Sequence, residues 1–233
     1  MAEISLHVLS GGAAQAIVRA VEKDFRVATG ASVRATFGAV GAMREKLFAG
    51  EPCDVVILTA ALVAELEREG RVLPGASAPL GRVRTGVAVR AGDALPDIAA
   101  GAALRATLLA ATGICFPDPK LATAGIHFVN VLRTLGIDEI VAPRLSPHPN
   151  GATAMRELAT ATGRGLVGCT QSTEIRYTPG VALVGPLPAG FELATVYTVA
   201  VSAGAREPDL ARRFAELLSS RETRPMRERA GFE

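Results

Sequence analysis

The sequence predicts an α/β protein with right-handed crossover connections, and two observations support this fold class. Short apolar runs alternate with amphipathic helical stretches along all 233 residues. Several runs are apolar throughout, such as Val55–Leu58, which is typical of parallel strands covered by helices on both faces. The length fits one large domain or two small ones, and 49% apolar against 21% charged residues is an ordinary globular balance.

The same patterning assigns each element in turn. The predicted strands are Ile4–Leu9, Val33–Phe37, Asp54–Leu58, Val83–Arg90, Gly113–Phe116, Gly165–Gly168, Val181–Val184 and Leu193–Ser202. A first helix follows the first strand, because apolar residues recur on one helical face between Ala13 and Phe25. The same periodicity predicts helices over Val40–Ala49, Ala60–Arg68, Ala102–Ala111, Ile126–Leu135, Ala152–Ala161 and Leu210–Ser219.

Composition excludes several classes of partner and cofactor. The net charge is only +2 with no basic stripe, and Trp is absent, so we expect no nucleic-acid partner. No apolar run reaches about 18 residues, so we expect no membrane insertion. Cys53, Cys115 and Cys169 are far apart, and the three His residues are isolated, so we expect no metal site. Gly11-Gly12 lacks the spacing and the Lys of a phosphate-binding loop, so we expect no cofactor. As a separate expectation, the protein is a monomer.

The first residues of the sequence, Met1–Leu9, have neither the basic start nor the apolar stretch of about 7–15 residues that a secretory signal needs. The segment is instead typical of a strand that begins almost at once. We therefore expect a cytoplasmic protein if residue 1 is the native start, and a periplasmic one if a leader has been removed.

Small or hydroxyl-bearing residues follow many of the predicted strands, where helices begin. Free backbone N–H groups at several helix starts can converge on an anion at the carboxyl edge of a sheet. The alternative is that these residues are ordinary helix caps. The segments concerned are Ser10-Gly11-Gly12, Gly38-Ala39-Val40-Gly41, Thr59, Thr123-Ala124-Gly125 and Thr170-Gln171-Ser172.

The order of these pieces carries a family resemblance. A strand leads into Ser10-Gly11-Gly12, a Phe-led loop follows at Phe37, and an A-G-x-P-x-D signature spans Ala49–Asp54. Further elements are Asp118-Pro119 through Ala124-Gly125, Asn150-Gly151-Ala152, and the ending Arg229–Phe232. Together they resemble the periplasmic molybdate-binding proteins, type II solute-binding proteins of ABC transporters, over nearly the whole chain.

The resemblance implies two lobes, each a mostly parallel sheet flanked by helices, with a ligand cleft between them. Lobe one would comprise residues 1–82 and 198–233, and lobe two residues 83–197. The hinge strands would lie near residues 83–90 and 193–202. The partners it implies are a small anionic ligand and, if the protein is exported, an ABC permease.

The resemblance transfers poorly at the positions that bind the oxyanion. The family's first Ser falls at Gly12, with Ser10 two residues earlier, and its second Ser falls in the loop that holds Val40-Gly41. The family's Tyr falls near Gly168, and the Ala124-Gly125 backbone position is kept. Because unpaired anion oxygens are costly in a closed site, the missing donors argue against molybdate as the ligand.

Other side chains could replace those donors. Arg84 could fit a carboxylate with its fork of N–H groups, although it could equally form a surface salt bridge, with Arg82 two residues away. Further candidates are the polar or small residues Thr59, Thr123, His127, Asn150, Gly151, Thr170, Gln171, Ser172 and Tyr197. Glu174 and Asp118 are expected to pair with Arg or cap helices, because carboxylates repel an anionic ligand.

Two classes of function remain open. The first is a binding protein for an organic di- or tricarboxylate, with molybdate or tungstate transport as a further alternative. The second is an enzyme on the same scaffold, since aconitate isomerase resembles the molybdate-binding proteins and shifts a proton in an unsaturated tricarboxylate. His127 would be its base, and Cys169 a second candidate because a thiol at a helix N-terminus has a lowered pKa.

Overall fold

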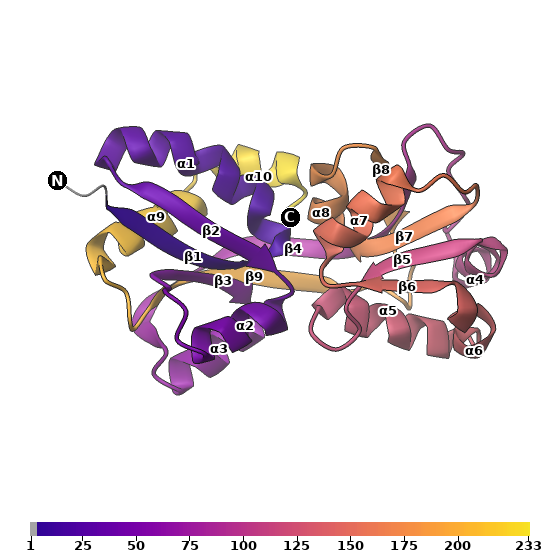
Figure 1. Ribbon diagram of the computed structural model, residues 1–233, viewed down its shortest axis with the longest axis horizontal. Coiled ribbons are helices and arrows are strands. Elements are labelled where there is room, and N and C mark those ends of the chain that lie inside the picture. The colour runs from indigo at the N-terminus through magenta and orange to yellow at the C-terminus, as the bar shows by residue number, and fades with distance from the viewer. Residues whose placement is uncertain (1–3) are drawn as a thin grey trace. The chain divides into compact units, whose positions relative to one another are not determined.

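The computed structural model describes residues 4–233 and consists of two compact units. Unit 1 comprises Met1–Val83 and Thr195–Glu233, and unit 2 comprises Arg84–Ala194. Residues 1–3 of the predicted first lobe lie outside the described residues. The chain crosses between the units once along β4 (Val72–Arg90) and once just before Thr195 (Figure 1).

Unit 1 is a sheet with the strand order β2-β1-β3-β9-β4. β1 pairs in parallel with β2 and β3, whereas β9 pairs antiparallel with β3. Its elements are β1 (Ser5–Gly11), η1 (Gly12–Ala14), α1 (Gln15–Thr29), β2 (Ser32–Gly38), α2 (Val40–Phe48), β3 (Val55–Thr59), α3 (Ala60–Arg68), β9 (Ala194–Ser202), α9 (Pro208–Ser219) and α10 (Arg224–Ala230).

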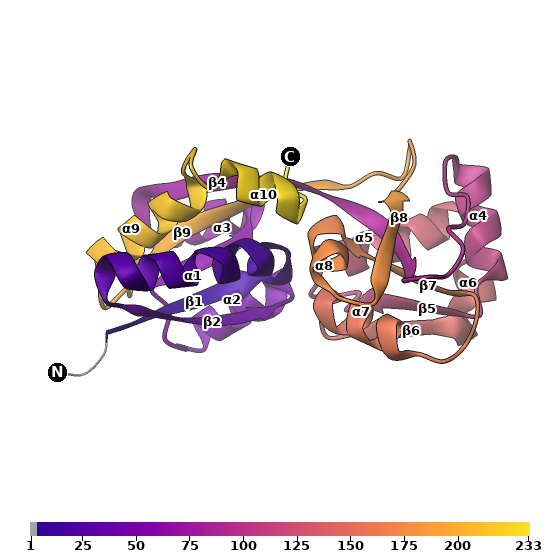
Figure 2. The same cartoon turned by 90° about the horizontal axis from the view of Figure 1, so that it is seen from above.

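Helices cover both faces of the sheet of unit 1, with α1, α9 and α10 on one face and α2 and α3 on the other (Figure 1). α1 and α9 lie side by side (Figure 2), and the rings of Phe25 and Phe214 meet edge to face with centroids 4.9 Å apart. All five residues of β3 are buried, as its apolar composition predicts.

Unit 2 is a second sheet, with the strand order β8-β4-β7-β5-β6. β5 pairs in parallel with β6 and β7, whereas β4 pairs antiparallel with β7 and β8. Its other elements are α4 (Gly101–Ala110), β5 (Gly113–Pro117), α5 (Thr123–Thr134), α6 (Asp138–Val141), η2 (Ala142–Arg144), β6 (Leu145–His148), α7 (Gly151–Thr160), β7 (Leu166–Gln171), α8 (Ser172–Tyr177) and β8 (Val181–Pro186).

The pleat of β7 separates two apolar cores in unit 2. Cys169 packs with Val87 in the core beneath α4 and α5, whereas Gly168 lies against Met155 and Leu158 of α7. Because side chains alternate along a strand, Gln171 follows Cys169 on the α4–α5 face, and Thr170 follows Gly168 on the α7 face. The carboxyl end of β7 therefore presents polar side chains to both faces of the sheet.

The α/β class is confirmed, but several details differ from the prediction. Both sheets are mixed rather than mostly parallel, because β9, β4 and β8 add antiparallel strands beside the parallel ones. β4 begins at Val72 instead of Val83, and β7 continues to Gln171 instead of ending at Gly168. The unpredicted elements β6, α6, α8 and α10 are too short to show a clear period.

Candidate functional site

The sheet of unit 1 brings its predicted site residues to one edge. β1, β2 and β3 run parallel, so their carboxyl ends lie together, with Gly11 opposite Gly38. Gly11 also lies against two predicted residues: a Cβ at this position would be 2.8 Å from Val40 Cγ1 and 3.1 Å from Tyr197 Cε1. Tyr197 is in turn opposite Thr59 in the β3–β9 ladder.

Two hydroxyl groups at this edge, those of Ser10 and Thr59, form hydrogen bonds within unit 1. Ser10 is fully buried, and its Oγ donates to the carbonyl of Gly11 at 2.9 Å. Thr59 caps α3, with its Oγ1 accepting from the N–H of Leu62 at 3.3 Å. Gly12 opens η1, and Val40 and Gly41 form the first turn of α2, whose N-cap Ala39 offers no side-chain hydrogen bond. This edge therefore offers an anion backbone N–H groups beside the apolar side chain of Val40, and the Ser10 hydroxyl is already used.

The start of α5 carries the predicted Thr123-Ala124-Gly125 element in unit 2. The helix begins at Thr123, and its N-cap, Ala122, makes no side-chain capping bond. Gly125 packs so closely on the carbonyl groups of Pro117 and Asp118 that a Cβ there would clash with both. Asp118 was expected to pair with an Arg or cap a helix, and its Oδ1 instead accepts from the N–H groups of Lys120 and Leu121 in the loop before α5.

His127 lies one turn into α5, and its ring is engaged. Its Nε2 is 2.7 Å from the carbonyl oxygen of Phe191, in the connection between β8 and β9. Because a carbonyl oxygen only accepts, this contact requires a proton on Nε2. The contact ties α5 to this connection, and a proton-transfer role for His127 stays a prediction.

The start of α7 meets the end of β7 around a buried carboxyl group. Asn150 caps α7, with its Oδ1 accepting from the N–H of Thr153 at 2.9 Å. A Cβ on Gly151 would collide with Glu174 Oε2 and Thr170 Oγ1. Thr170 donates from Oγ1 to Glu174 Oε2 at 2.6 Å, and Glu174 also accepts from the backbone N–H groups of Gln171 and Ala152. Sequence reasoning set Glu174 aside, and the structure places it beside three predicted site residues.

Gln171 in unit 2 has a deeply buried side-chain amide without hydrogen-bond partners. Its side chain is 2% exposed, and neither its Nε2 nor its Oε1 has a hydrogen-bond partner. The buried hydroxyl groups of Thr85, opposite Gln171 in the β4–β7 ladder, and of Thr173 also lack partners. Because a buried polar group without a partner is costly, these groups at the carboxyl end of β7 are suited to a bound polar ligand. Ser172, which opens α8, is buried beside them.

Two arginines of β4, Arg82 and Arg84, differ in their surroundings. Arg82 is exposed and forms a surface ion pair with Glu233 at 3.4 Å, which is the ordinary role of a charged residue on a strand. Arg84 is half-buried and begins the segment of β4 that belongs to unit 2, directly before Thr85.

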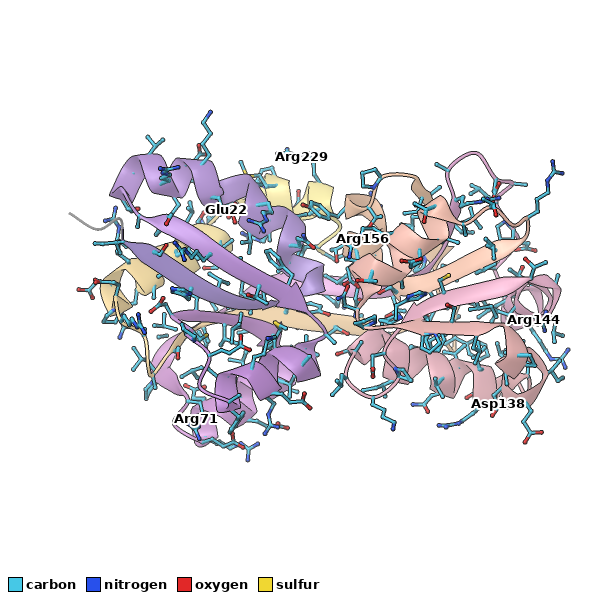
Figure 3. All side chains as sticks on the ribbon, in the orientation of Figure 1. Glu22, Arg71, Asp138, Arg144, Arg156 and Arg229 are labelled. Atoms are coloured by element: carbon cyan, nitrogen blue, oxygen red, sulfur yellow. The ribbon has the colours of Figure 1, made fainter. Side chains whose placement is uncertain are left out.

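The Ala49–Asp54 signature serves the structure of unit 1 rather than its candidate site. Asp54 is buried, and its carboxylate accepts from the N–H groups of His7 and Arg206, both at 2.7 Å. It lines a cavity of about 440 Å³ with Arg71 (Figure 3), at the end of the sheet where β3 starts and β9 ends. The signature therefore fixes β1, β3 and the start of α9 to one another.

The expectation of a reactive Cys169 is wrong. The residue lies within β7 rather than at a helix start, it is fully buried, and burial raises the pKa of its thiol. Burial likewise raises the pKa of Cys53 to about 12. Among residues 4–233 there is no cluster of three or more His, Cys, Asp or Glu side chains that could hold a metal ion. No helix in that range combines the length and the hydropathy needed to cross a bilayer.

Comparison with known proteins assigns the family. A sequence profile of the bacterial extracellular solute-binding proteins matches residues 6–233. An aconitate isomerase from Pseudomonas sp. is 27% identical over 237 residues, which cover 98% of this chain and 87% of that enzyme.

Solved structures share the fold at lower identity. The periplasmic molybdate-binding protein of Azotobacter vinelandii superposes with a TM-score of 0.81 at 18% identity, over 98% of both chains. PEB3 bound to L-phospholactate superposes with a TM-score of 0.70 at 16% identity, over 98% of this chain and 99% of that one. The similarity in fold therefore extends over nearly the whole chain.

Proposed function

Because this chain belongs to the bacterial extracellular solute-binding proteins, we propose that it binds a small organic anion with two or three carboxylate groups, rather than molybdate. The observation that carries the proposal is the apolar edge of unit 1. Val40 and Tyr197 lie against Gly11, and the nearby Ser10 hydroxyl donates its hydrogen bond to the backbone carbonyl of Gly11. A tetrahedral oxyanion needs several donors at once, and at this edge the Ser10 hydroxyl already donates to a backbone carbonyl while Val40 carries no hydroxyl.

Unit 2 supplies groups that suit an organic acid. Arg84 can bind a carboxylate in a two-pronged fashion, and the amide of Gln171 can both donate and accept. The N–H groups at the start of α5 add a partial positive charge. The similarity to an aconitate isomerase and to a phospholactate-binding protein supports organic acids as the ligand class.

The proposed role is capture of this anion outside the cytoplasm for delivery to an ABC permease. It is supported by the family's extracellular assignment and by the fold shared with a periplasmic molybdate-binding protein.

A titration against a panel of anions tests the proposal. Calorimetry would compare molybdate, tungstate and sulfate with citrate, tricarballylate, trans-aconitate and malate. We expect binding of at least one carboxylate and none of molybdate at micromolar concentration. Micromolar affinity for molybdate, or no affinity for any carboxylate, would overturn the proposal.

Arg84→Ala provides the matching variant. We expect it to weaken carboxylate binding by about tenfold to a hundredfold, because a charge-assisted pair contributes about 1.5–3 kcal/mol. Arg82→Ala, two residues away and paired with Glu233, is the control and should leave the dissociation constant unchanged. Equal effects of the two substitutions would remove Arg84 from the site.

The second candidate is an isomerase acting on an unsaturated tricarboxylate. The 27% identity to an aconitate isomerase over 98% of this chain is the observation that favours it. Proton NMR of the purified protein with cis- and trans-aconitate tests this activity directly. Interconversion that His127→Gln abolishes would establish the enzyme and its base, and the absence of interconversion would reject it.

A further inference from the structure

A cavity of about 350 Å³ lies within unit 1, and none of the candidate site residues lines it. Its charged lining comes mainly from residues 221–228, at the start of α10, and its apolar lining comes from Leu80 and Phe232. Arg82 and Glu233 exchange two backbone hydrogen bonds, of 2.9 and 2.8 Å, which fix the chain after α10 against β4. The volume lies at the lower end of the roughly 300–1,000 Å³ that small-molecule pockets occupy.

Arg227 is a buried arginine of this lining whose donors are only partly used. Its Nη1 donates to the carbonyl oxygens of Leu218 and Ser220, at 2.7 and 2.9 Å, and to Thr223 Oγ1 at 2.8 Å. These bonds close the end of α9. Within residues 4–233, Nε and Nη2 have no hydrogen-bond partner, and neither atom is sealed from solvent. The capping role therefore explains one nitrogen of the guanidinium and leaves the other two open to the cavity.

Positive charge around the cavity is only partly neutralised by the protein. Arg224 pairs with Glu228 at 2.8 Å, and the other acidic residue of the lining, Glu233, is paired with an arginine of β4. Neither Arg221 nor Arg227 forms an ion pair with a residue in the described part of the chain. Burial lowers the pKa of Arg227, Arg224 lowers it further, and Glu228 opposes this only in part. An anion in the cavity would stabilise the charged form of this guanidinium.

We propose that this cavity is a second ligand site, which binds the phosphate group of a small molecule through Arg221 and Arg227. Phosphate oxygens accept charge-assisted hydrogen bonds in the geometry that a guanidinium fork offers. The two negative charges of a phosphate group also match the two arginines that lack a carboxylate partner. Because Leu80 and Phe232 give the cavity an apolar wall, a phosphate ester of a small alcohol suits it as well as inorganic phosphate does.

Arg221→Ala tests the inference in the full chain. Arg221 is exposed, and its side chain makes no hydrogen bond or ion pair with residues 4–233, so the substitution should leave the fold intact. Calorimetric titrations would use inorganic phosphate and glycerol 3-phosphate. We expect the unmodified protein to bind at least one of them and the variant to bind it about tenfold more weakly, because a charge-assisted hydrogen bond is lost.

Two further variants make the result specific. Arg212→Ala removes the same charge from an exposed position on α9 outside the cavity and should leave phosphate binding unchanged. Glu228→Gln removes a negative charge from the lining and should strengthen phosphate binding. Thermal unfolding of each variant would establish that it is folded.

The possible outcomes separate this inference from the proposed function. Failure of the unmodified protein to bind either phosphate compound overturns the inference, as does an equal loss of affinity in Arg212→Ala and Arg221→Ala. Phosphate binding that is lost in Arg84→Ala and kept in Arg221→Ala also overturns it, because the phosphate would then occupy the candidate carboxylate site. Each of these results leaves carboxylate binding to be judged by its own titration, which Arg221→Ala should not change.

Discussion

Gly151 is the residue on which the packing around Glu174 depends. A methyl group at this position would collide with Glu174 Oε2 and Thr170 Oγ1, and Glu174 is held in place by three donors. We therefore expect Gly151→Ala to destabilise the protein by about 1–3 kcal/mol, as overpacking does in a buried position. Urea denaturation followed by circular dichroism measures this change.

Gly163→Ala is the matched control for this substitution. Its new methyl group would lie 3.7 Å from the nearest atom, in ordinary contact with Leu166, so we expect a change within about 0.5 kcal/mol. If Gly151→Ala is as stable as Gly163→Ala, Glu174 is free to move aside and is not fixed at the start of α7.

At single positions, the sequence predicted which segments matter better than it predicted what their side chains do. Thr170 was expected to face a ligand, and it donates to Glu174 instead. Ser10 was expected to offer a hydroxyl, and that hydroxyl binds the adjacent carbonyl. Glu174 was set aside because a carboxylate repels anions, and it is buried against Gly151 and Thr170, two of the predicted site residues. Hydrogen bonds such as these leave no periodic pattern in a sequence, so the partners of individual side chains could not be predicted from it.

Among the secondary-structure elements, α4 depends on an arginine from outside the helix. Arg144, in η2 before β6, donates from Nη1 to the carbonyl oxygens of Leu109 and Ala111 at 2.7 and 2.6 Å (Figure 3). These carbonyls lie at the end of α4, where the helix dipole favours a cation. We expect Arg144→Met to destabilise unit 2 by about 1.5–3 kcal/mol in urea denaturation, because the bonds are to a charged donor.

Arg133→Met is the control for this helix-capping role. Arg133 is exposed on α5 and bonds only the nearby Asn130 at 3.3 Å, so its loss should cost less than about 0.5 kcal/mol. A similar small change in Arg144→Met would mean that water replaces Arg144 at the end of α4.

The elements that the sequence predicted well are those with a long or fully apolar pattern. α3 has the predicted bounds, Ala60–Arg68, and the strand predicted from Asp54 is β3. The antiparallel partners β9 and β4 were predicted as strands, but their direction depends on contacts between distant segments. Thr170-Gln171-Ser172 was marked as a candidate helix start, and the six-residue α8 does begin at Ser172, but it is too short for its extent to be predicted from a helical period.

For the whole molecule, the main prediction concerns the backbone segments of each unit that a ligand protects. Unit 1 offers the starts of η1 and α2, and unit 2 offers Arg84 and the start of α5. Because opening must first release the ligand, a bound carboxylate slows amide exchange wherever it contacts the backbone. We expect saturating ligand to slow hydrogen exchange at residues 10–12 and 38–41 in unit 1 and at residues 122–125 in unit 2.

Hydrogen exchange followed by mass spectrometry can assign this protection to each unit separately. A ligand at a hundred times its dissociation constant stabilises the folded state by about 2.7 kcal/mol, which is ample for detection. Protection confined to unit 2 would mean that Arg84 and the start of α5 suffice, and that the edge formed by Gly11, Val40 and Tyr197 takes no part. Arg84→Ala should abolish the protection at residues 122–125, because the ligand leaves unit 2 when its principal ion pair is removed.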